Sequence, residues 1–452
     1  MIEARTYQGK TIGVFGLART GVAAAEALIA SGAEVWAWDD NTERTASAPF
    51  DTVNLHTANF NDLDALLLAP GVPLTHPEPH ALVKKAQEAD VRIISDFDVF
   101  EGGRKDLPAH QTVAITGTNG KSTTTALITH MIAECGKPSV MGGNIGTGVL
   151  TLDPMPEGGV YVFEMSSFQL DITSDFRPDI SVLLNMTPDH LDRHGDMDGY
   201  AKAKGRIFEI QDKNAKAVIS VDDEYSRSFA KQYSDRTIPV SVKVILDNGI
   251  SVQNGVLHDR LDDNHQNYNL LDAKTLVGEH NHQNAAATYA VGRLLRFDGA
   301  AIVNSFASFP GLTHRQELVA ELDGVRFIND SKGTNPDAAA RALDAFTHIH
   351  WIAGGRAKGA LGNSLKDHLS AVKHAYLIGE SADELAGLIG DKVPCDMSGT
   401  LKAAIAAAKE NAASGDVILL SPACTAFDQF QNFEDRGDAF KAIVKEYGGQ
   451  NQ

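Results

Sequence analysis

Short apolar runs alternate with helix-like segments along most of the chain. An apolar run at 11–16 precedes an alanine-rich segment at 20–31 that ends before Gly32, and another run follows at 34–38. A glycine in that place is typical of a helix end, because glycine adopts the left-handed conformation without strain. Two more apolar runs follow, at 66–68 and 92–94. This order of strand, helix and strand predicts a parallel sheet covered by helices.

The middle of the chain keeps this pattern and then departs from it. Strands are predicted at 112–115, 160–163 and 180–184. Between about 240 and 271, two short apolar segments flank Asn254-Gly255, a dipeptide that favours a tight β-hairpin turn. Helical periodicity returns at 284–295. We therefore expect a small antiparallel patch on a parallel sheet.

The last third of the chain again alternates strands with helices. Strands are predicted at 325–328, 350–353, 375–378 and 417–420. A helix predicted at 336–346 has Asn335 as its N-cap and Pro336 in its first turn, where these residue types are favoured.

Length and composition support several domains. At 452 residues the chain is too long for a single core. The polar stretch 102–111, which contains Pro108, is predicted to link the first domain to the second. We predict an α/β fold of three domains: a Rossmann-like N-terminal domain over 1–108, a central P-loop mononucleotide-binding domain with the antiparallel patch over 109–312, and a Rossmann-like C-terminal domain over 313–452.

Charge and cysteine content argue against several classes of protein. The 40 Lys and Arg residues against 59 Asp and Glu give a net charge of −19, which does not suit a protein that binds a nucleic-acid backbone. Cys135, Cys395 and Cys424 form neither a metal motif nor a disulfide framework, which favours a reducing compartment. The start of the chain has no signal-peptide pattern, and no apolar run approaches membrane-spanning length. We expect a cytoplasmic monomer that binds neither membranes nor nucleic acids.

The clearest chemical signal follows the predicted strand 112–115 and precedes a helical pattern at 123–135. It is the run Gly117, Thr118, Asn119, Gly120, Lys121, Ser122 and Thr123. Its glycines let the backbone approach an anion, with N–H groups pointing into the loop, and the helix N-terminus adds positive potential. Lys121 would meet the outer phosphates of a nucleotide, and the Ser122 hydroxyl could bind Mg²⁺.

This loop is shorter than the standard phosphate-binding motif. Ile115 stands where the eight-residue motif has its first glycine. An ordinary glycine-rich turn would explain Gly-Lys-Ser alone, but it would not explain a strand before the turn and a helix after it.

Glu164 ends the predicted strand 160–163, and ligands gather at the carboxyl ends of parallel strands. A carboxylate there could hold Mg²⁺ directly or through water. The alternative is an acid stabilised at a helix N-terminus. The phosphate loop in the same predicted sheet favours the metal.

His190 lies between Asp189 and Asp192, after the predicted strand 180–184. A histidine in a loop is usually exposed and without function, but its position after the next strand of the same sheet favours a second divalent-metal site. Lys204, in a helical stretch at 200–210, has the pattern of an ordinary surface lysine.

Three polar or glycine-rich turns follow three predicted strands of the last domain. They span 330–335, 354–359 and 421–425, and together they would form one rim of one sheet. Lys332, Lys358 and the backbone N–H groups of these turns would suit a small anionic substrate. Ordinary loop chemistry explains any one of these turns well, and all three together less well.

The first domain carries Gly16-Leu17-Ala18-Arg19-Thr20-Gly21, which is close to the dinucleotide-binding fingerprint except that Ala18 replaces its middle glycine. Asp39, at the end of the second strand, stands where such proteins bind a ribose. The pattern indicates a nucleotide-shaped crevice. An NAD-dependent oxidoreductase would explain this domain, but not the phosphate loop of the next one.

In this order, the motifs resemble those of the Mur ligases, the ATP-dependent amide-bond-forming enzymes of peptidoglycan synthesis. The resemblance covers essentially the whole chain. Its specific stretches are 117–123, 142–146, 164–170, 189–193, 311–315, 329–332, 421–424 and 427–430. The first and fourth are shared with the wider family, which includes folylpolyglutamate synthase, and the last is similar to the branch that adds D-glutamate.

The resemblance implies roles for the residues of the phosphate loop and the metal sites. Lys121 would hold the phosphates of ATP within the loop 117–123, and Ser122 with Glu164 would hold one Mg²⁺. His190 would bind a second Mg²⁺, and Mn²⁺ could replace either ion. Lys204 matches the lysine that is carbamylated in the family, and its new carboxylate would help to hold the second ion. This role for Lys204 comes from the resemblance alone.

Other positions match residues that bind substrates in the family. The ATP-binding set would be completed by Asn281 and Asn284 near the adenine, and by Arg315 and Asp330 near the phosphates and ribose. The UDP-sugar would be bound by Thr20, Asp39, Asn144 and His190. D-Glutamate would be bound by Lys332, Thr334, Lys358, Phe427 and Phe433.

Two regions depart from the family pattern. Ala426 stands where relatives often have serine, so that a hydroxyl contact to D-glutamate is missing unless Thr425 supplies it. In the first domain, Ala18, Arg19, Asp40 and Asn41 differ from the best-known members, which leaves the uridine contacts open.

The resemblance implies that D-glutamate is added to UDP-N-acetylmuramoyl-L-alanine through an acyl phosphate and a tetrahedral intermediate, with release of ADP and phosphate. Another Mur ligase or a folylpolyglutamate synthase would differ in the amino acid used. A nucleotide-gated binding protein would use the same loop, but it would leave Glu164, His190 and the rim unexplained.

Overall fold

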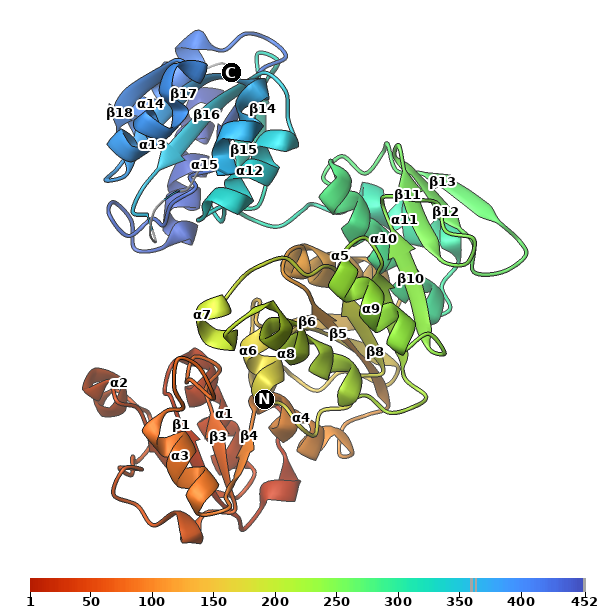
Figure 1. Ribbon diagram of the computed structural model, residues 1–452, viewed down its shortest axis with the longest axis vertical. Coiled ribbons are helices and arrows are strands. Elements are labelled where there is room, and N and C mark those ends of the chain that lie inside the picture. The colour runs from red at the N-terminus through yellow and green to blue at the C-terminus, as the bar shows by residue number, and fades with distance from the viewer. Residues whose placement is uncertain (358–360, 362–363, 450–452) are drawn as a thin grey trace. The chain divides into compact units, whose positions relative to one another are not determined.

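The computed structural model describes residues 1–357, 361 and 364–449 (Figure 1). The chain forms two compact units, one made of Met1–Ala273 with Glu279–Phe309, and one made of Lys274–Gly278 with the chain from Pro310 onward. The strands of the described residues form three sheets, two in the first unit and one in the second. The predicted α/β class is therefore confirmed, while the predicted domain boundaries stay predictions.

The first sheet has four parallel strands in the order β2-β1-β3-β4. Its strands are β1 (Thr11–Phe15), β2 (Glu34–Trp38), β3 (Ala65–Leu68) and β4 (Arg92–Ile94). The accompanying helices are α1 (Arg19–Ala30), α2 (Thr42–Ala46), α3 (Ala81–Glu88) and α4 (Asp96–Arg104). Apolar residues of α1 and α4 share one buried core, and those of α3 belong to another, so that both faces of the sheet are covered. The predicted strands are within a residue of the observed ones.

The predicted linker 102–111 is wrong at both ends. Helix α4 continues through Arg104, and strand β5 already begins at His110. Phe97, Phe100 and Gly103 of α4 are buried, and a capping box at Ser95 fixes its start. The stretch is polar, so the pattern of apolar residues did not indicate the last turn of this helix.

The second sheet has nine strands in the order β13-β12-β11-β10-β9-β8-β5-β7-β6. They are β5 (His110–Thr116), β6 (Ser139–Gly143), β7 (Gly159–Glu164), β8 (Ile180–Leu183), β9 (Lys216–Ser220), β10 (Thr237–Ser241), β11 (Ile250–Gln253), β12 (Val256–Asp259) and β13 (Gln266–Asn269). The last three pair antiparallel and the rest pair parallel. Asn254 and Gly255 both have positive φ, as a type I′ turn requires, so the predicted hairpin is confirmed.

The helices of this sheet lie on both of its faces. They are α5 (Lys121–Glu134), α6 (Ser167–Ile172), α7 (Leu191–His194), α8 (Met197–Glu209), α9 (Glu224–Gln232), α10 (Glu279–Leu294) and α11 (Gly299–Ala307). Helix α10 begins five residues before its prediction, because its first turn buries amides such as Asn281 and Gln283 rather than apolar groups. Periodicity of apolar residues does not detect such a turn.

The third sheet has the order β14-β15-β19-β16-β17-β18 and is parallel except for the β14–β15 pair. Its strands are β14 (Glu317–Leu322), β15 (Val325–Asn329), β16 (Ile349–Gly354), β17 (Val372–Ile378), β18 (Cys395–Gly399) and β19 (Val417–Leu420). One face is covered by α12 (Pro336–Asp344) and α13 (Ala382–Ile389), and the other by α14 (Leu401–Asn411) and α15 (Phe433–Gly449). The Asn335 side chain accepts from the Ala338 N–H at 2.8 Å, which confirms the predicted cap.

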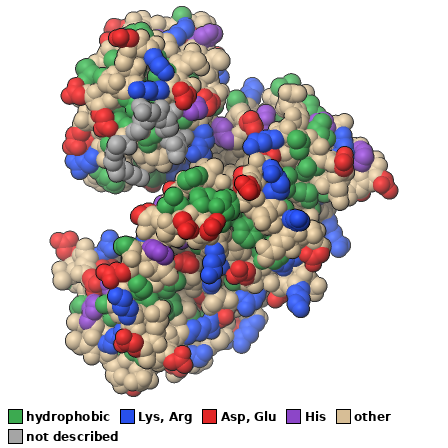
Figure 2. Space-filling model, viewed as in Figure 1, with side chains coloured by type: hydrophobic (Ala, Val, Ile, Leu, Met, Phe, Trp, Pro, Cys, Tyr) green, Lys and Arg blue, Asp and Glu red, His purple; other side chains and the backbone are tan. Residues whose placement is uncertain are grey.

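Acidic and basic side chains are interspersed on the face shown in Figure 2. Of the helices that the structure describes, none combines the length and the apolar character needed to cross a membrane.

Two buried carboxylates of α4 lie at the junction of the first and second sheets. The Asp98 carboxylate accepts hydrogen bonds from the N–H groups of Ser174 at 2.9 Å, Asp175 at 2.5 Å and Phe176 at 3.3 Å. Asp96 is also buried, and its side chain accepts from the Phe97 N–H at 3.1 Å. Burial and, to a smaller extent, the negative charge of Asp98 raise the pKa of Asp96 to about 7.

We predict that Asp96→Asn stabilises the protein increasingly as the pH rises from about 5 to about 8. Between the ordinary aspartate pKa and about 7, the folded state keeps a proton that the unfolded state has lost, so wild-type stability falls with rising pH. The asparagine cannot ionise, and its advantage should reach on the order of 3 kcal/mol above pH 7. Unfolding of the full chain at both pH values measures this difference.

Asp98→Asn is the control for this experiment. It weakens an acceptor of three backbone N–H groups and should lower stability at both pH values. A constant effect of Asp96→Asn across the pH range would contradict the prediction.

Candidate active site

The phosphate loop connects β5 to α5, and α5 begins at Lys121, inside the motif. Gly120 precedes the helix in the left-handed conformation, and a Cβ atom there would lie 2.3 Å from Oδ1 of Asn284. Only glycine fits this position. The N–H groups of Thr118 and Asn119 donate to the carbonyl and side-chain oxygens of Asn185, at 2.8 and 2.9 Å. These two N–H groups therefore brace the loop from outside. The sequence analysis predicts N–H groups that point into the loop, and for these two that prediction is wrong.

Two lysine ammonium groups meet at the carbonyl oxygen of Gly117. Nζ of Lys121 donates to it at 2.8 Å and also to the Thr118 carbonyl at 2.7 Å. Nζ of Lys204 donates to the same Gly117 oxygen at 2.9 Å. The two positive charges are thus held close together at the start of the loop.

Lys204 is completely buried, so its assignment from the sequence pattern to the protein surface was wrong. Burial lowers its pKa well below the ordinary value, and the charge of Lys121 lowers it further, against smaller opposing effects of Asp189 and Glu164. Helix α8 places Lys204 on the same face as Tyr200 and Ile207, both of which are buried. This spacing of three and four residues is the signal in the sequence that could have revealed its burial.

Glu164 is the last residue of β7 and pairs with Ile115 of β5, next to the phosphate loop. Its Oε1 accepts from the Asn144 amide at 3.0 Å. Its Oε2 is buried and has no hydrogen-bond partner among the described residues. A buried carboxylate oxygen is costly unless it is paired or coordinates a metal ion. This orphaned oxygen fits an Mg²⁺ site, and Ser122, the other predicted ligand, is also buried.

Protein side chains alone do not complete this metal site. Among the residues that the structure describes, no three His, Cys, Asp or Glu side chains are grouped so as to hold an ion. Mg²⁺ commonly takes one or two carboxylates and fills its other positions with phosphate oxygens and water, so this arrangement suits it.

His190 precedes α7 in the left-handed conformation, and its side chain is about half exposed. Its Nε2 lies 3.5 Å from the Asp189 carboxylate, and its ring packs on that of Phe168 at 4.8 Å between centroids. The carboxyl end of β8 thus presents an imidazole on the same sheet edge as Glu164.

The two asparagines predicted near the adenine lie in α10 and are buried. Asn284 accepts from the Thr124 hydroxyl and donates to Oδ1 of Asn281, both at 3.1 Å. Gln283, which the sequence analysis missed, accepts from Asn185 at 2.8 Å. Asn185 directly follows the predicted strand 180–184. Its position at a strand end is the feature of the sequence that could have indicated its role in bracing the loop.

The residues predicted to bind the UDP-sugar lie on different elements of the first unit. Thr20 is in the first turn of α1, Asn144 follows β6, and Asp39 follows β2. The Asp39 carboxylate accepts from the N–H groups of Leu17 at 2.6 Å and Asn41 at 2.8 Å. Asp39 therefore braces the glycine turn, whatever contact it makes to a ribose.

The three turns of the third sheet come together, as the sequence predicts. The Ser421 hydroxyl donates to Oδ2 of Asp330 at 2.7 Å, and the Gly354 N–H donates to the Pro422 carbonyl at 2.9 Å. We call the described parts of these turns, 330–335, 354–357 and 421–425, the rim.

Arg436 of α15 holds the rim together and was missed in the sequence. Its guanidinium is buried and donates to the carbonyls of Ser331 at 3.0 Å, Cys424 at 3.1 Å and Thr425 at 3.2 Å. Burial lowers its pKa to about 10. It stands among Glu434, Asp435 and Gly437, so the sequence resembles an exposed helix and gives no sign of this role.

Other predicted residues surround the rim. Nζ of Lys332 lies 5.5 Å from the centre of the Phe433 ring, and Phe427 is largely exposed. Nε of Arg315 is buried without a hydrogen-bond partner among the described residues. Burial raises the pKa of Asp330 to about 6. The remaining two predicted positions are Thr334, within the rim, and Lys358, which lies outside the described residues.

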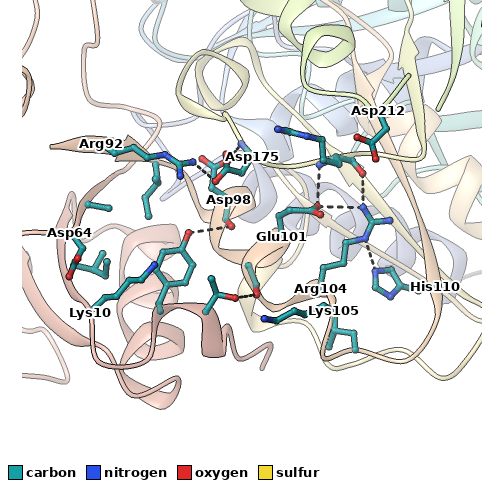
Figure 3. Close-up of a pocket in the computed structure, with 18 of the residues that line it drawn as sticks. Lys10, Asp64, Arg92, Asp98, Glu101, Arg104, Lys105, His110, Asp175 and Asp212 are labelled. Carbon is teal, nitrogen blue, oxygen red and sulfur yellow. Dashed lines mark hydrogen bonds and ion pairs between the residues drawn. The ribbon is translucent and has the colours of Figure 1, made fainter. Parts of the chain in front are cut away.

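A polar pocket of about 820 Å³ lies elsewhere in the first unit (Figure 3). It is lined near the amino-terminal ends of strands, by Lys10 before β1, Arg92 at the start of β4 and His110 at the start of β5. Figure 3 shows Arg92 directed toward Asp175. The predicted site residues line none of this pocket, because they lie at the carboxyl ends of the strands.

Known proteins share both the sequence and the fold. Residues 115–292 match the family model of the Mur ligase middle domain, and residues 314–424 match that of the Mur ligase glutamate ligase domain. The UDP-N-acetylmuramoylalanine–D-glutamate ligase of Caulobacter vibrioides is 47% identical over 98% of this chain and 97% of its own. The protein of the same name from Paramagnetospirillum magneticum is 41% identical over 99% of both chains.

A solved structure shows the same fold at low identity. The UDP-N-acetylmuramate-alanine ligase MurC of Thermotoga maritima aligns with a TM-score of 0.58 and 18% identity, covering 98% of this chain and 100% of its own. Together with the full-length sequence identity above, this likeness settles the classification: the chain belongs to the Mur ligase family.

Proposed function

We propose that this protein is an ATP-dependent ligase that adds D-glutamate to UDP-N-acetylmuramoyl-L-alanine in the synthesis of peptidoglycan precursors. The observation that carries the proposal is the 47% identity, over 98% of the chain, with a ligase of that name. The phosphate loop, the orphaned oxygen of Glu164 and the rim give this reaction the groups that it needs. The protein acts in the cytoplasm, as a monomer, on these small molecules.

The chemistry begins from a carboxylate, which is a poor electrophile because it already carries negative charge. One oxygen of the L-alanine carboxylate takes the γ-phosphoryl group of ATP, and the bond to the bridging oxygen of ADP breaks. The amine of D-glutamate attacks the resulting acyl phosphate at its carbonyl carbon. The tetrahedral intermediate expels phosphate, and the nitrogen loses a proton to leave the amide.

The chain contributes mainly position and charge to these steps. Lys121 exchanges its bonds to the Gly117 and Thr118 carbonyls for bonds to the outer phosphates of ATP. The first turn of α5 offers backbone N–H groups and the positive end of its dipole to the same phosphates. Asn281 and Asn284 border the adenine, and Arg315 and Asp330 bind the phosphates and ribose.

Two divalent ions, Mg²⁺ or Mn²⁺, would be held by Ser122 with Glu164 and by His190 with a modified Lys204. When bound, such ions neutralise the charge that develops on the transferred phosphoryl group. Glu164 supplies a carboxylate oxygen that has no other partner among the described residues.

The modification of Lys204 is a carbamate. Burial favours the neutral amine of this side chain, as its lowered pKa indicates. The nitrogen lone pair attacks the carbon of carbon dioxide, a carbon–nitrogen bond forms, and a proton leaves to give an N-carboxylate. The new negative charge then lies near the Lys121 ammonium, which shares the Gly117 carbonyl with Lys204, and this favours the product.

The organic substrates occupy the remaining predicted positions. Thr20, Asp39, Asn144 and His190 bind the UDP-sugar. D-Glutamate is bound by Lys332 and Thr334 of the rim together with Lys358, Phe427 and Phe433. The side chain of Ala426 cannot donate a hydrogen bond. The Thr425 hydroxyl, which donates to the Arg356 carbonyl at 2.7 Å, would have to turn away from it to supply that contact to the substrate carboxylate.

We predict that phosphate release from ATP requires both the UDP-sugar and D-glutamate. With UDP-N-acetylmuramoyl-L-alanine present, D-glutamate should give rapid release, and L-alanine, L-glutamate and diaminopimelate should not. A coupled phosphate assay of the purified protein measures this. Equal release with L-glutamate, or release with ATP alone, would contradict the assigned substrate.

We also predict that Lys204→Ala loses activity and that small carboxylates added in solution restore part of it. Removal of one charge-stabilising group typically costs roughly 10²–10³ in rate. Lys202→Ala is the matched control, because Lys202 lies on the same helix but is exposed, and it should keep wild-type activity. Full activity of Lys204→Ala, or a loss that no carboxylate relieves, would argue against the carbamate.

A further inference from the structure

We infer that Arg193 is a positioning residue that holds the nucleotide-binding turns of the first sheet in register with the phosphoryl-transfer site of the second. This inference rests on the proposed function, because the substrate must then reach from one sheet to the other.

Arg193 lies in the short helix α7, three residues after His190. Its side chain extends from the part of the unit built on the second sheet to the part built on the first. Its guanidinium donates through Nη1 to the Gly71 carbonyl at 2.9 Å and through Nη2 to the Val72 carbonyl at 3.1 Å. These two carbonyls follow β3 of the first sheet. The planar fork of the arginine reaches the two acceptors through two different nitrogens, which fixes the orientation of the guanidinium.

The other side of Arg193 is fixed to the candidate active site. Its guanidinium carbon lies 4.6 Å from the centre of the Phe168 ring. The same ring packs against His190 at 4.8 Å and against His194 at 5.6 Å. Phe168 lies in α6, which follows Glu164 by a few residues. One aromatic ring therefore supports both the arginine and a predicted metal ligand.

The loop that Arg193 binds is itself locked to the glycine turn of the first sheet. The Ala69 N–H donates to the Phe15 carbonyl at 2.9 Å, and the Val72 N–H donates to the Ala69 carbonyl at 3.0 Å. A Cβ atom on Gly16 would lie 2.5 Å from Cβ of Ala69, so the two turns are in direct contact. A shift of the loop after β3 must therefore move the turn that carries the predicted sugar-nucleotide contacts.

A second arginine crosses the same junction near its substrate-facing edge. Arg19, which departs from the family pattern, donates from its guanidinium to the Gly146 carbonyl. Gly146 lies two residues after Asn144, whose amide bonds to Glu164. The first crossing thus starts from the helix next to His190, and the second ends on the segment whose Asn144 is bonded to Glu164.

The opposite edge of this junction has its own connections. Arg92 pairs with Asp175 and donates to the Ser174 hydroxyl, near the amino-terminal ends of the strands (Figure 3). This contact also joins the two sheets, but it is remote from the carboxyl ends where the site lies. Arg92 therefore provides a matched control, an exposed cross-junction arginine that touches no predicted site residue.

The consequence for catalysis is geometric. One substrate molecule is held by its nucleotide on the first sheet and must present its carboxylate to the γ-phosphate at the second. Misplacement of this carboxylate by about 1 Å can lower the rate roughly 10²-fold. ATP binding does not involve the first sheet, so the affinity for ATP does not depend on this register.

The test compares Arg193→Ala, Arg193→Lys and Arg92→Ala in the full-length protein. For Arg193→Ala, kcat/KM for UDP-N-acetylmuramoyl-L-alanine should fall roughly 10- to 100-fold, while the Kd of Mg·ATP and the midpoint of thermal unfolding stay unchanged. Arg193→Lys should recover part of the loss, because a lysine can reach one of the two carbonyls. Arg92→Ala should leave kcat/KM near the wild-type value, since exposed ion pairs contribute little.

Three outcomes would overturn the inference while wild-type activity is intact: unchanged kcat/KM in Arg193→Ala, an equal loss in Arg92→Ala, or a parallel loss of ATP affinity in Arg193→Ala. A wild-type protein without D-glutamate-dependent phosphate release would instead overturn the proposed function, and the inference with it.

Discussion

The convergence of Lys121 and Lys204 on the carbonyl oxygen of Gly117 determines the character of the site. Two ammonium groups share one acceptor, and one of them is fully buried. Such a centre is stable only if negative charge lies nearby or if one amine is neutral. Both solutions fit the proposed ligation: a polyphosphate would supply the negative charge, and a neutral Lys204 would be ready for the proposed reaction with carbon dioxide.

The rest of the unit fixes the geometry of this centre. Asn185 and Gln283 hold the loop from one side, and the Thr118 hydroxyl accepts from the Thr187 N–H at 3.0 Å. Glu164 lies on the neighbouring strand with one oxygen bonded to Asn144 and the other unpaired among the described residues. Asn185 and Glu164 lie at strand ends, where the parallel sheet brings them to a common edge, whereas Gln283 reaches the loop from helix α10.

Much of this arrangement could be predicted from local sequence, and the remainder could not. The strands of the first sheet, the Asn254-Gly255 hairpin and the Asn335 cap depend on neighbouring residues, so local pattern identifies them. Arg436 is buried by contacts that include the distant Ser331, and its local pattern resembles that of an exposed helix. Lys204 bonds to the distant Gly117, and only its spacing from Tyr200 and Ile207 signals its burial. The last turn of α4 was missed because it contains Glu101, two glycines and Arg104 instead of apolar residues, and the first turn of α10 was missed because it buries the amide of Asn281.

The central claim is that the loop around Lys121 binds a triphosphate whose terminal group is passed to a carboxylic acid. The most direct measurement uses UDP-N-acetylmuramoyl-L-alanine with isotopically labelled oxygen in its carboxylate, together with ATP and D-glutamate. The account predicts that one labelled oxygen appears in the released phosphate, because the carboxylate oxygen that receives the phosphoryl group leaves with it. Phosphate without label, formed together with the amide product, would contradict the acyl-phosphate route.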